Sequence, residues 1–191
     1  MKIRSFFSLT LRSALTAGML ALLISSRCAI AQDNSVLTYH GDDSRSGHFV
    51  VPSLSWEKAR SVRLDRTFEA RVAGALYAQP LYWRPPDSNS GILLVATQDD
   101  VVQAIDATTG KELWRRVIGH PVSRSSLPCG NINPLGITGT PVIDPATQAI
   151  YFDAAVLGAE GDNRLHAFRG DTGEKIFVSE PLIGLRHLQT L

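Results

Sequence analysis

Cysteine is scarce in this chain, and three further features that would identify common protein classes are missing. Only two of the 191 residues are cysteine, Cys28 and Cys129, which excludes a disulfide framework. The five histidines have no zinc-ligand spacing. The net charge is only +1 and no dense basic patch occurs, which argues against a nucleic-acid partner. After residue 24 no apolar run is long enough to span a membrane.

The N-terminus has the three parts of a secretory signal peptide. A basic start with Lys2, Arg4 and Arg12 precedes an apolar run over 13–24 and a small-residue cleavage site at 29–31. This pattern predicts cleavage after Ala31 and a periplasmic or secreted protein with no transmembrane segment. The alternative is a lipoprotein anchored at Cys28, but Arg27 stands directly before it, where small residues are expected.

Removal of residues 1–31 changes the balance of charge and cysteine. The remaining 160 residues carry a net charge of −3. They retain a single cysteine, Cys129, so no disulfide can form within the mature chain.

An internal repeat is the most informative feature present. The stretch Val101–Trp114 returns 63 residues later as a variant that ends at Phe177. Four positions correspond between the two copies: Ala104 and Ala167, Thr109 and Thr172, Gly110 and Gly173, and the aromatic pair Trp114 and Phe177. Self-similarity of this kind indicates that one structural unit is used more than once and that neighbouring units stack.

Each copy is predicted to form four short antiparallel strands, which makes the chain all-β. Apolar and aromatic runs alternate with Asp, Asn, Gly and Thr, the usual pattern of strands and turns. Gly110 and Gly173 stand where the third strand turns into the fourth, and glycine tolerates the positive φ of a tight hairpin. The strands are expected at 80–81, 92–96, 101–105 and from 112 in the first copy, and at 141–143, 150–155, 164–168 and from 175 in the second. A weak helical signal spans Ser55–Arg63.

The first copy resembles the pyrroloquinoline-quinone (PQQ) type repeat. The resemblance rests on Ala104, Asp106, Thr109, Gly110 and Trp114, which match the pattern Ala-x-Asp-x-x-Thr-Gly-x-x-x-Trp. That repeat builds β-propellers of four-stranded blades, both in quinoprotein alcohol dehydrogenases and in non-enzymatic proteins. The resemblance implies that Trp114 docks between neighbouring blades.

The second copy departs from this pattern at two positions. Arg169 replaces the aspartate and Phe177 replaces the tryptophan. The contacts of the second turn and of Phe177 are therefore less firmly predicted than those of the first copy.

The predicted organisation is an incomplete propeller of about two to three blades. A closed ring needs at least about four blades of roughly 40–50 residues, so an N-terminal piece of a longer propeller is favoured over a compact two-sheet fold. Further blades, or self-association, are then the expected partners. The segments are a signal peptide (1–31), a leading segment with a partial blade (32–74), repeat 1 (75–119), an inter-blade loop (120–135), repeat 2 (136–180) and the start of another blade (181–191).

The loop at 120–135 is the candidate functional segment, with Cys129, Asn131 and Asn133 as its candidate residues. Long loops in compact domains are often functional. Cys129 is interpreted as a reactive thiol, as one half of a bridge to a residue in further C-terminal blades or, with preference, as a small buried residue beneath the loop. Two asparagines without nearby carboxylates make a poor site for a hard metal ion.

The functional prediction is a binding or scaffold module with no catalysis of its own and no assigned cofactor. Its expected ligand is a protein, peptide or glycan on the loop face. The alternative is a fragment of a quinoprotein oxidoreductase that binds PQQ and Ca²⁺. In that family adjacent cysteines cap the cofactor and a tryptophan stacks on it. This chain has no Cys-Cys pair, and Trp83, the candidate for stacking, precedes Arg84-Pro85-Pro86, which indicates a loop.

Overall fold

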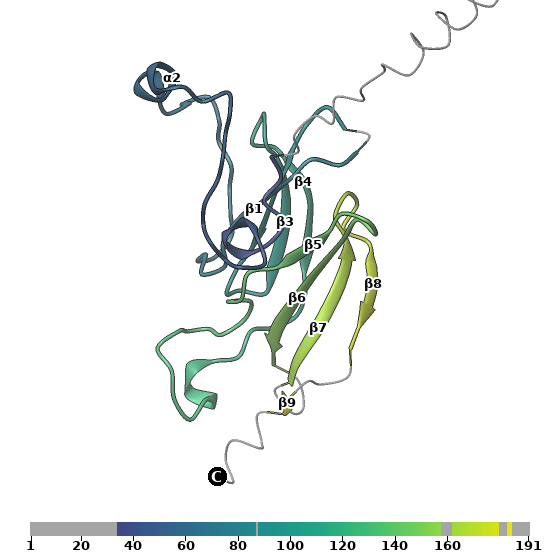
Figure 1. Ribbon diagram of the computed structural model, residues 1–191. Coiled ribbons are helices and arrows are strands. Elements are labelled where there is room, and N and C mark those ends of the chain that lie inside the picture. Colours follow the sequence, from purple (N-terminus) through teal and green to yellow (C-terminus); the bar gives the residue numbers. More distant parts are fainter. Residues whose placement is uncertain (1–33, 87, 158–161, 180–182, 185–191) are drawn as a thin grey trace, which may run out of the picture. The chain divides into compact units, whose positions relative to one another are not determined.

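Two antiparallel sheets, each with a row of four strands, form the centre of the structure, a computed structural model that describes residues 34–86, 88–157, 162–179 and 183–184 (Figure 1). The first sheet has the order β1-β2-β3-β4 and the second the order β5-β6-β7-β8. The strands of the first sheet are β1 Leu81–Trp83, β2 Ile92–Ala96, β3 Val101–Asp106 and β4 Glu112–Val117. Those of the second are β5 Val142–Asp144, β6 Ala149–Val156, β7 Asp162–Arg169 and β8 Lys175–Val178.

The all-β fold class predicted from the sequence is confirmed, and the two copies agree in detail. Both sheets contain the same irregularity between the third and fourth strands. Ala104 pairs with Trp114 before the register shifts, and Ala167 pairs with Phe177 before the equivalent shift. A β-bulge re-aims side chains and increases local twist. Its presence at the same place in both copies shows that the sequence repeat is a structural repeat.

The segments outside the two sheets contain little regular structure. A two-residue strand, β9 (Ile183–Gly184), pairs with the start of β7 and so belongs to the second sheet. Two 3₁₀ turns occur among the described residues, η2 (Tyr39–Gly41) and η3 (Arg124–Ser126). In the described part of the leading segment, 34–74, the sole strand-like pairing is an isolated bridge from Val36 to Tyr82. The predicted signal peptide, and the other residues of 181–191, lie outside the described residues.

A short helix, α2 (Trp56–Ser61), forms inside the weak helical signal at Ser55–Arg63. Ser55 caps its start, because its Oγ accepts a hydrogen bond from the Lys58 amide at 3.3 Å. The helix has no buried residue. Among the described residues, no helix is long and apolar enough to cross a membrane.

The buried core runs from the first sheet into the second. Leu81, Ala104 and Ile150 are fully buried and belong to one apolar cluster with Trp83. Trp83 is 1% exposed, and its ring lies so close to Gly170 that a Cβ there would be 2.6 Å from it. β1 ends at Trp83, so Arg84-Pro85-Pro86 lies in a loop as predicted, whereas the Trp83 ring itself fills the core.

Candidate functional site

The turn after β3 is held closed by Asp106, the aspartate of the repeat pattern. Its Oδ1 accepts hydrogen bonds from the amides of Thr108 and Thr109, at 3.0 and 2.7 Å, and from the Thr109 hydroxyl at 2.9 Å. Bonding to the Ser90 hydroxyl and then to Thr109 holds the pKa of Asp106 at about 2. Gly110 follows with φ of 75°. Asp106, Thr109 and Gly110 therefore act as turn residues.

The second turn closes in the same way although Arg169 stands where the first copy has aspartate. Its main-chain bond from the Gly173 amide to the Arg169 carbonyl, 2.8 Å, matches the 2.9 Å bond from the Gly110 amide to the Asp106 carbonyl. Arg169 forms an ion pair with Asp171 at 3.1 Å. The Asp171 carboxylate in turn accepts the Thr172 amide at 2.9 Å. A carboxylate thus still caps the turn, from a position two residues later.

Trp114 joins the first sheet to the second. The side chain is 8% exposed, and its Nε1 donates a 3.1 Å hydrogen bond to the Gly170 carbonyl. Its ring lies over the second turn, where a Cβ on Gly173 would be 2.7 Å away. Arg116 adds a 2.8 Å bond from Nε to the Gly173 carbonyl. Trp114 therefore contacts the turn between β7 and β8 of the second sheet.

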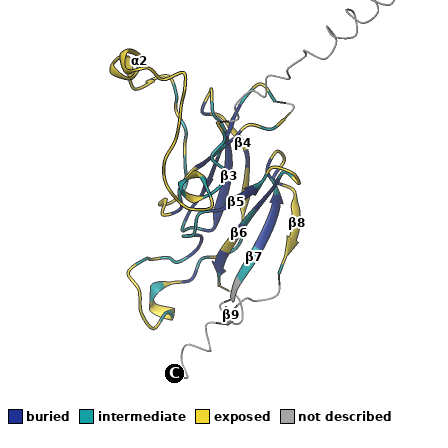
Figure 2. Cartoon of the chain, in the orientation of Figure 1, coloured by how far each residue is buried: buried dark blue, intermediate teal, exposed yellow. Residues whose placement is uncertain are grey.

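Phe177, the counterpart of Trp114, has no such cover among the described residues. It is 41% exposed, and its nearest ring, Tyr151, lies 6.3 Å away between centroids on the adjoining part of the second sheet. Ala104 and Ala167, opposite the two aromatic residues, are fully buried. Figure 2 shows the contrast along the second sheet, with the described part of β7 buried or half-buried and β8 exposed.

The loop at 120–135 does not bury its cysteine. Cys129 is exposed, so the preferred interpretation of it as a buried residue is wrong. Val122, at 1% exposed, supplies the buried apolar contact instead. It pairs with Leu135 through two 2.8 Å main-chain bonds that close the base of the loop. Cys129 lies in the part that extends beyond this base.

The two asparagines of the loop do not converge on a site. Both are exposed, and Oδ1 of Asn133 already accepts the Arg124 amide at 2.9 Å. Arg124 also donates from Nη1 to the Leu127 carbonyl at 3.2 Å, so the loop is held by its own residues. Within the ranges that the structure describes, no group of three His, Cys, Asp or Glu side chains is placed to hold a metal ion.

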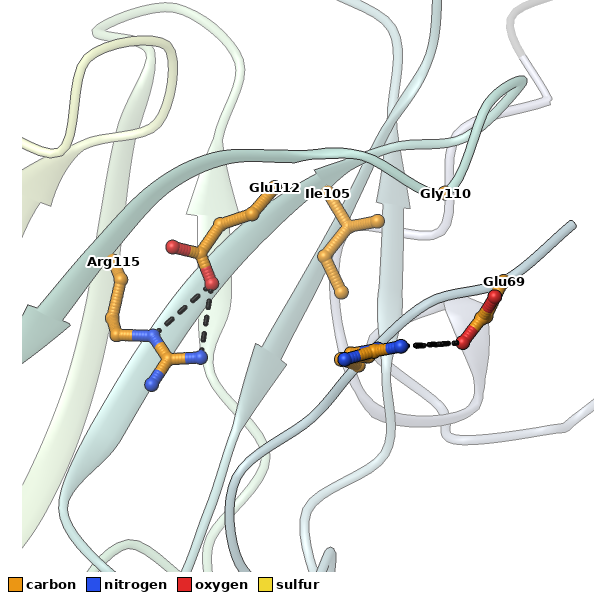
Figure 3. Close-up of a pocket in the computed structure, with 6 residues that line it drawn as sticks. Glu69, Ile105, Gly110, Glu112 and Arg115 are labelled. Atoms are coloured by element: carbon orange, nitrogen blue, oxygen red, sulfur yellow. Dashed lines mark hydrogen bonds and ion pairs between the residues drawn. The ribbon is translucent and has the colours of Figure 1, made fainter.

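A charged pocket of about 400 Å³ lies beside the third and fourth strands of the first sheet. Two ion pairs line it, Arg71 with Glu69 at 3.1 Å and Arg115 with Glu112 at 3.0 Å (Figure 3). Ile105 and Gly110 complete its wall. The pocket was not predicted from the sequence, because its two ion pairs are about 40 residues apart in the chain. The only local pattern was a Glu followed by an Arg two or three residues later.

Asp100, in the turn between β2 and β3, is fully buried and neither of its carboxylate oxygens has a hydrogen-bond partner in the described structure. Burial, followed by the charge of Asp99, raises the pKa of Asp100 to about 7. The carboxylate faces Gly136, where a Cβ would be 2.5 Å from its Oδ1. The Asp100 side chain therefore packs the β2–β3 hairpin of the first sheet against the loop that leads to the second sheet.

His166 is a second buried polar residue, at the position that Gln103 holds in the first copy. It is 5% exposed, stacks on Phe152 at 5.4 Å between centroids, and its Nε2 has no hydrogen-bond partner in the described structure. Burial, then the charges of Arg164 and Lys175, lower its pKa. Its surroundings therefore favour the neutral imidazole over the charged one.

Comparisons with known proteins give a distant likeness to solved structures. No family model matches the chain, and no curated protein is similar to it at a significant level. Among solved structures, the chain is similar to a protein described as a europium-containing methanol dehydrogenase, with a TM-score of 0.37 and 22% sequence identity. The match covers 53% of this chain and 14% of the dehydrogenase chain.

Proposed function

We propose that this chain is a binding or scaffold module built from PQQ-type repeats, with no catalysis of its own. The observation that carries the proposal is the use of the repeat residues. Asp106 and Gly110 close a turn, and Trp114 holds the next sheet. The residues that define the repeat thus serve to stack sheets, which is how repeat proteins build an extended surface for a partner.

The chemistry of the ligand follows from the charged pocket and the exposed loop. Glu69, Arg71, Glu112 and Arg115 present both signs of charge at the pocket, and they are exposed enough to exchange partners. Such a surface suits a polar macromolecule, a protein, peptide or glycan, better than an apolar small molecule. The loop around Cys129 adds an exposed edge of the kind that often carries binding.

Further sheets of the same repeat are proposed to cover the exposed side of the second sheet. Phe177 is the counterpart of Trp114 in the second copy. Trp114 is covered by the second turn, whereas Phe177 is 41% exposed. Its neighbours Ile176 and Val178 are also exposed, at 50% and 38%. A row of large apolar side chains on one strand favours contact with another protein surface.

Export to the periplasm or the exterior is part of the proposal and rests on residues 1–31. Intact-mass analysis of the secreted protein is expected to give a chain that begins at Gln32. A start at Cys28 with attached lipid, or an uncleaved product in the cytosol, would contradict it.

The alternative, a piece of a quinoprotein oxidoreductase, rests on the repeat pattern and does not fit the described residues. PQQ in that family needs a tryptophan face and a cysteine pair. Trp83 is packed against Gly170 in the core, and Cys129 has no second cysteine in the mature chain. The oxygen of Asn133, a candidate for Ca²⁺, is bonded to the Arg124 amide.

Thermal unfolding with PQQ and Ca²⁺ tests the alternative directly. We expect no rise in the melting temperature and no dye-linked alcohol or aldose oxidation. A ligand that binds the folded state at 100 times its Kd would stabilise it by about 2.7 kcal/mol, which is easily measured. A saturable rise in melting temperature would overturn the binding claim, and turnover would make the quinoprotein alternative the preferred function.

A further inference from the structure

The stretch before β1 contacts the first sheet at the same place where β4 contacts the second. A Cβ on Gly173 would be 2.7 Å from the Trp114 ring, and a Cβ on Gly110 would be 2.6 Å from the Glu69 carbonyl oxygen. Residues near Glu69 therefore cover the first turn as β4 covers the second. The stretch takes the place of an outer strand, yet the structure assigns no strand there.

The Gln103 side chain fixes which way this stretch faces. Its Nε2 donates to the Arg71 carbonyl at 3.2 Å, and its Oε1 accepts the Ala73 amide at 3.2 Å. In an extended chain the main-chain groups of alternate residues point to opposite sides. The N–H and C=O groups of Ala70 and Val72 therefore point away from the first sheet.

This outward edge is open and has the form of a strand. From Phe68 to Val72, half-buried side chains alternate with the exposed side chains of Glu69 and Arg71, a period of two residues that is typical of a strand. Among the described residues, no main-chain group of 68–72 hydrogen-bonds to another main-chain group. Unpaired edges of this kind are templates for pairing with another chain.

We propose that residues 68–72 pair with the same residues of a second copy of this chain, as antiparallel strands about a twofold axis. With Ala70 opposite Ala70, the two alanines exchange two hydrogen bonds, and Phe68 faces Val72 in both directions. An isologous contact of this kind requires a self-complementary edge.

The charges of the segment meet this requirement. In the proposed register Glu69 of each copy lies opposite Arg71 of the other, as a non-hydrogen-bonded pair, in which side chains approach most closely. In a single copy the two form an ion pair at 3.1 Å, with 73% of the Glu69 side chain and 87% of the Arg71 side chain exposed. Such exposed pairs are weak, so exchange of partners between copies costs little. Glu69 and Arg71 also line the charged pocket, so the dimer and a ligand at that pocket would use the same two side chains.

Sedimentation equilibrium on the purified protein tests the contact. We expect a reversible dimer, and we expect Ala70→Pro to abolish it because proline removes the central N–H. Glu69→Arg and Arg71→Glu each place like charges opposite one another and should weaken the dimer about tenfold. The double variant Glu69→Arg/Arg71→Glu restores opposite charges and should return the Kd to within about threefold of the parent.

Controls separate this edge from the apolar surface of β8. Phe177→Ser should leave the dimer intact, and circular dichroism should show that every variant is folded. Hydrogen exchange at the Ala70 and Val72 amides should slow as protein concentration rises. The proposal is overturned by a monomer at all concentrations, by a dimer that Phe177→Ser abolishes, or by failure of the double charge swap to restore association.

Discussion

Trp114 and Phe177 occupy the same place in two sheets with the same strand order and the same bulge, yet one is buried and the other exposed. The difference comes from what lies across from each ring. Trp114 meets the turn of a following sheet at Gly170 and Gly173, whereas no described residue covers Phe177 in that way. The comparison shows that a repeat sheet fixes its own strand register, while the burial of its outer aromatic residue depends on its neighbour.

Replacement of the two aromatic residues should give the largest difference. Trp114→Ala removes a buried ring and its hydrogen bond to Gly170, and should lower the free energy of unfolding by about 3–5 kcal/mol. Phe177→Ala should lower it by about 1 kcal/mol or less, because much of its ring is already in water. Urea titration followed by tryptophan-independent far-ultraviolet circular dichroism measures both. Equal effects would contradict the docking role of Trp114.

Glycine substitutions should separate the effect of the Trp114 contact on stability from the effect of backbone strain. Gly173→Ala combines a φ of 65° with a clash against the Trp114 ring, and should cost about 2–3 kcal/mol. Gly47→Ala is the matched control, because its φ is also 65° and the atom nearest to the added Cβ, His40 Nδ1, would lie at 3.7 Å, an ordinary contact. We expect the control to lose roughly 1–2 kcal/mol from backbone strain alone. If the two variants unfold at the same urea concentration, the close approach of Trp114 to Gly173 is not supported.

The buried polar residues of the two copies should respond to pH in opposite directions. The folded pKa of Asp100 is raised to about 7 from 3.8. Its contribution to the free energy of unfolding is therefore fully present below pH 3.8 and is lost as the pH rises toward 7. Asp100→Asn should remove this loss, which is at most about 1.4 kcal/mol per pH unit. The folded pKa of His166 is lowered from 6.5, so its contribution is present above pH 6.5 and is lost as the pH falls below that value.

Urea titrations between pH 4 and 8 test both statements. His166→Gln, which copies the residue at position 103, should reduce the loss of stability on the acid side and leave the Asp100 effect unchanged. Asp99 faces Asp100, and Arg164, Lys175 and Asp153 face His166, so Asp99→Asn should lower the midpoint of the Asp100 transition. An unchanged pH profile in Asp100→Asn would contradict the assignment.

Local features of the fold could be predicted from the sequence because they depend on neighbouring residues. Alternating apolar runs located the strand Ile92–Ala96, and glycine marked the turns at Gly110 and Gly173, both with positive φ. The position of Trp114 against the next sheet followed from the resemblance to a repeat. The residues that gave these predictions lie within about 15 positions of each other in the chain, or within one repeat.

Features that depend on distant residues could not be predicted. The burial of Trp83 requires Gly170, and the charged pocket requires residues 69–71 to lie beside β3 and β4. The exposure of Cys129 depends on a bridge between Val122 and Leu135 that no local pattern marks. Cysteine is usually buried by its apolar character, but the loop is closed at its base by other residues and leaves Cys129 in water.

The bond between Trp114 and Gly170 also has a consequence for the order of events during synthesis. The two residues are 56 positions apart, and the first sheet is complete well before its docking turn exists. At about 5–20 residues per second, the ring would wait roughly 3–11 s on the growing chain before Gly170 leaves the ribosome. During that interval Trp114 is a solvent-exposed apolar side chain on a finished edge strand, which is the kind of surface that chaperones recognise.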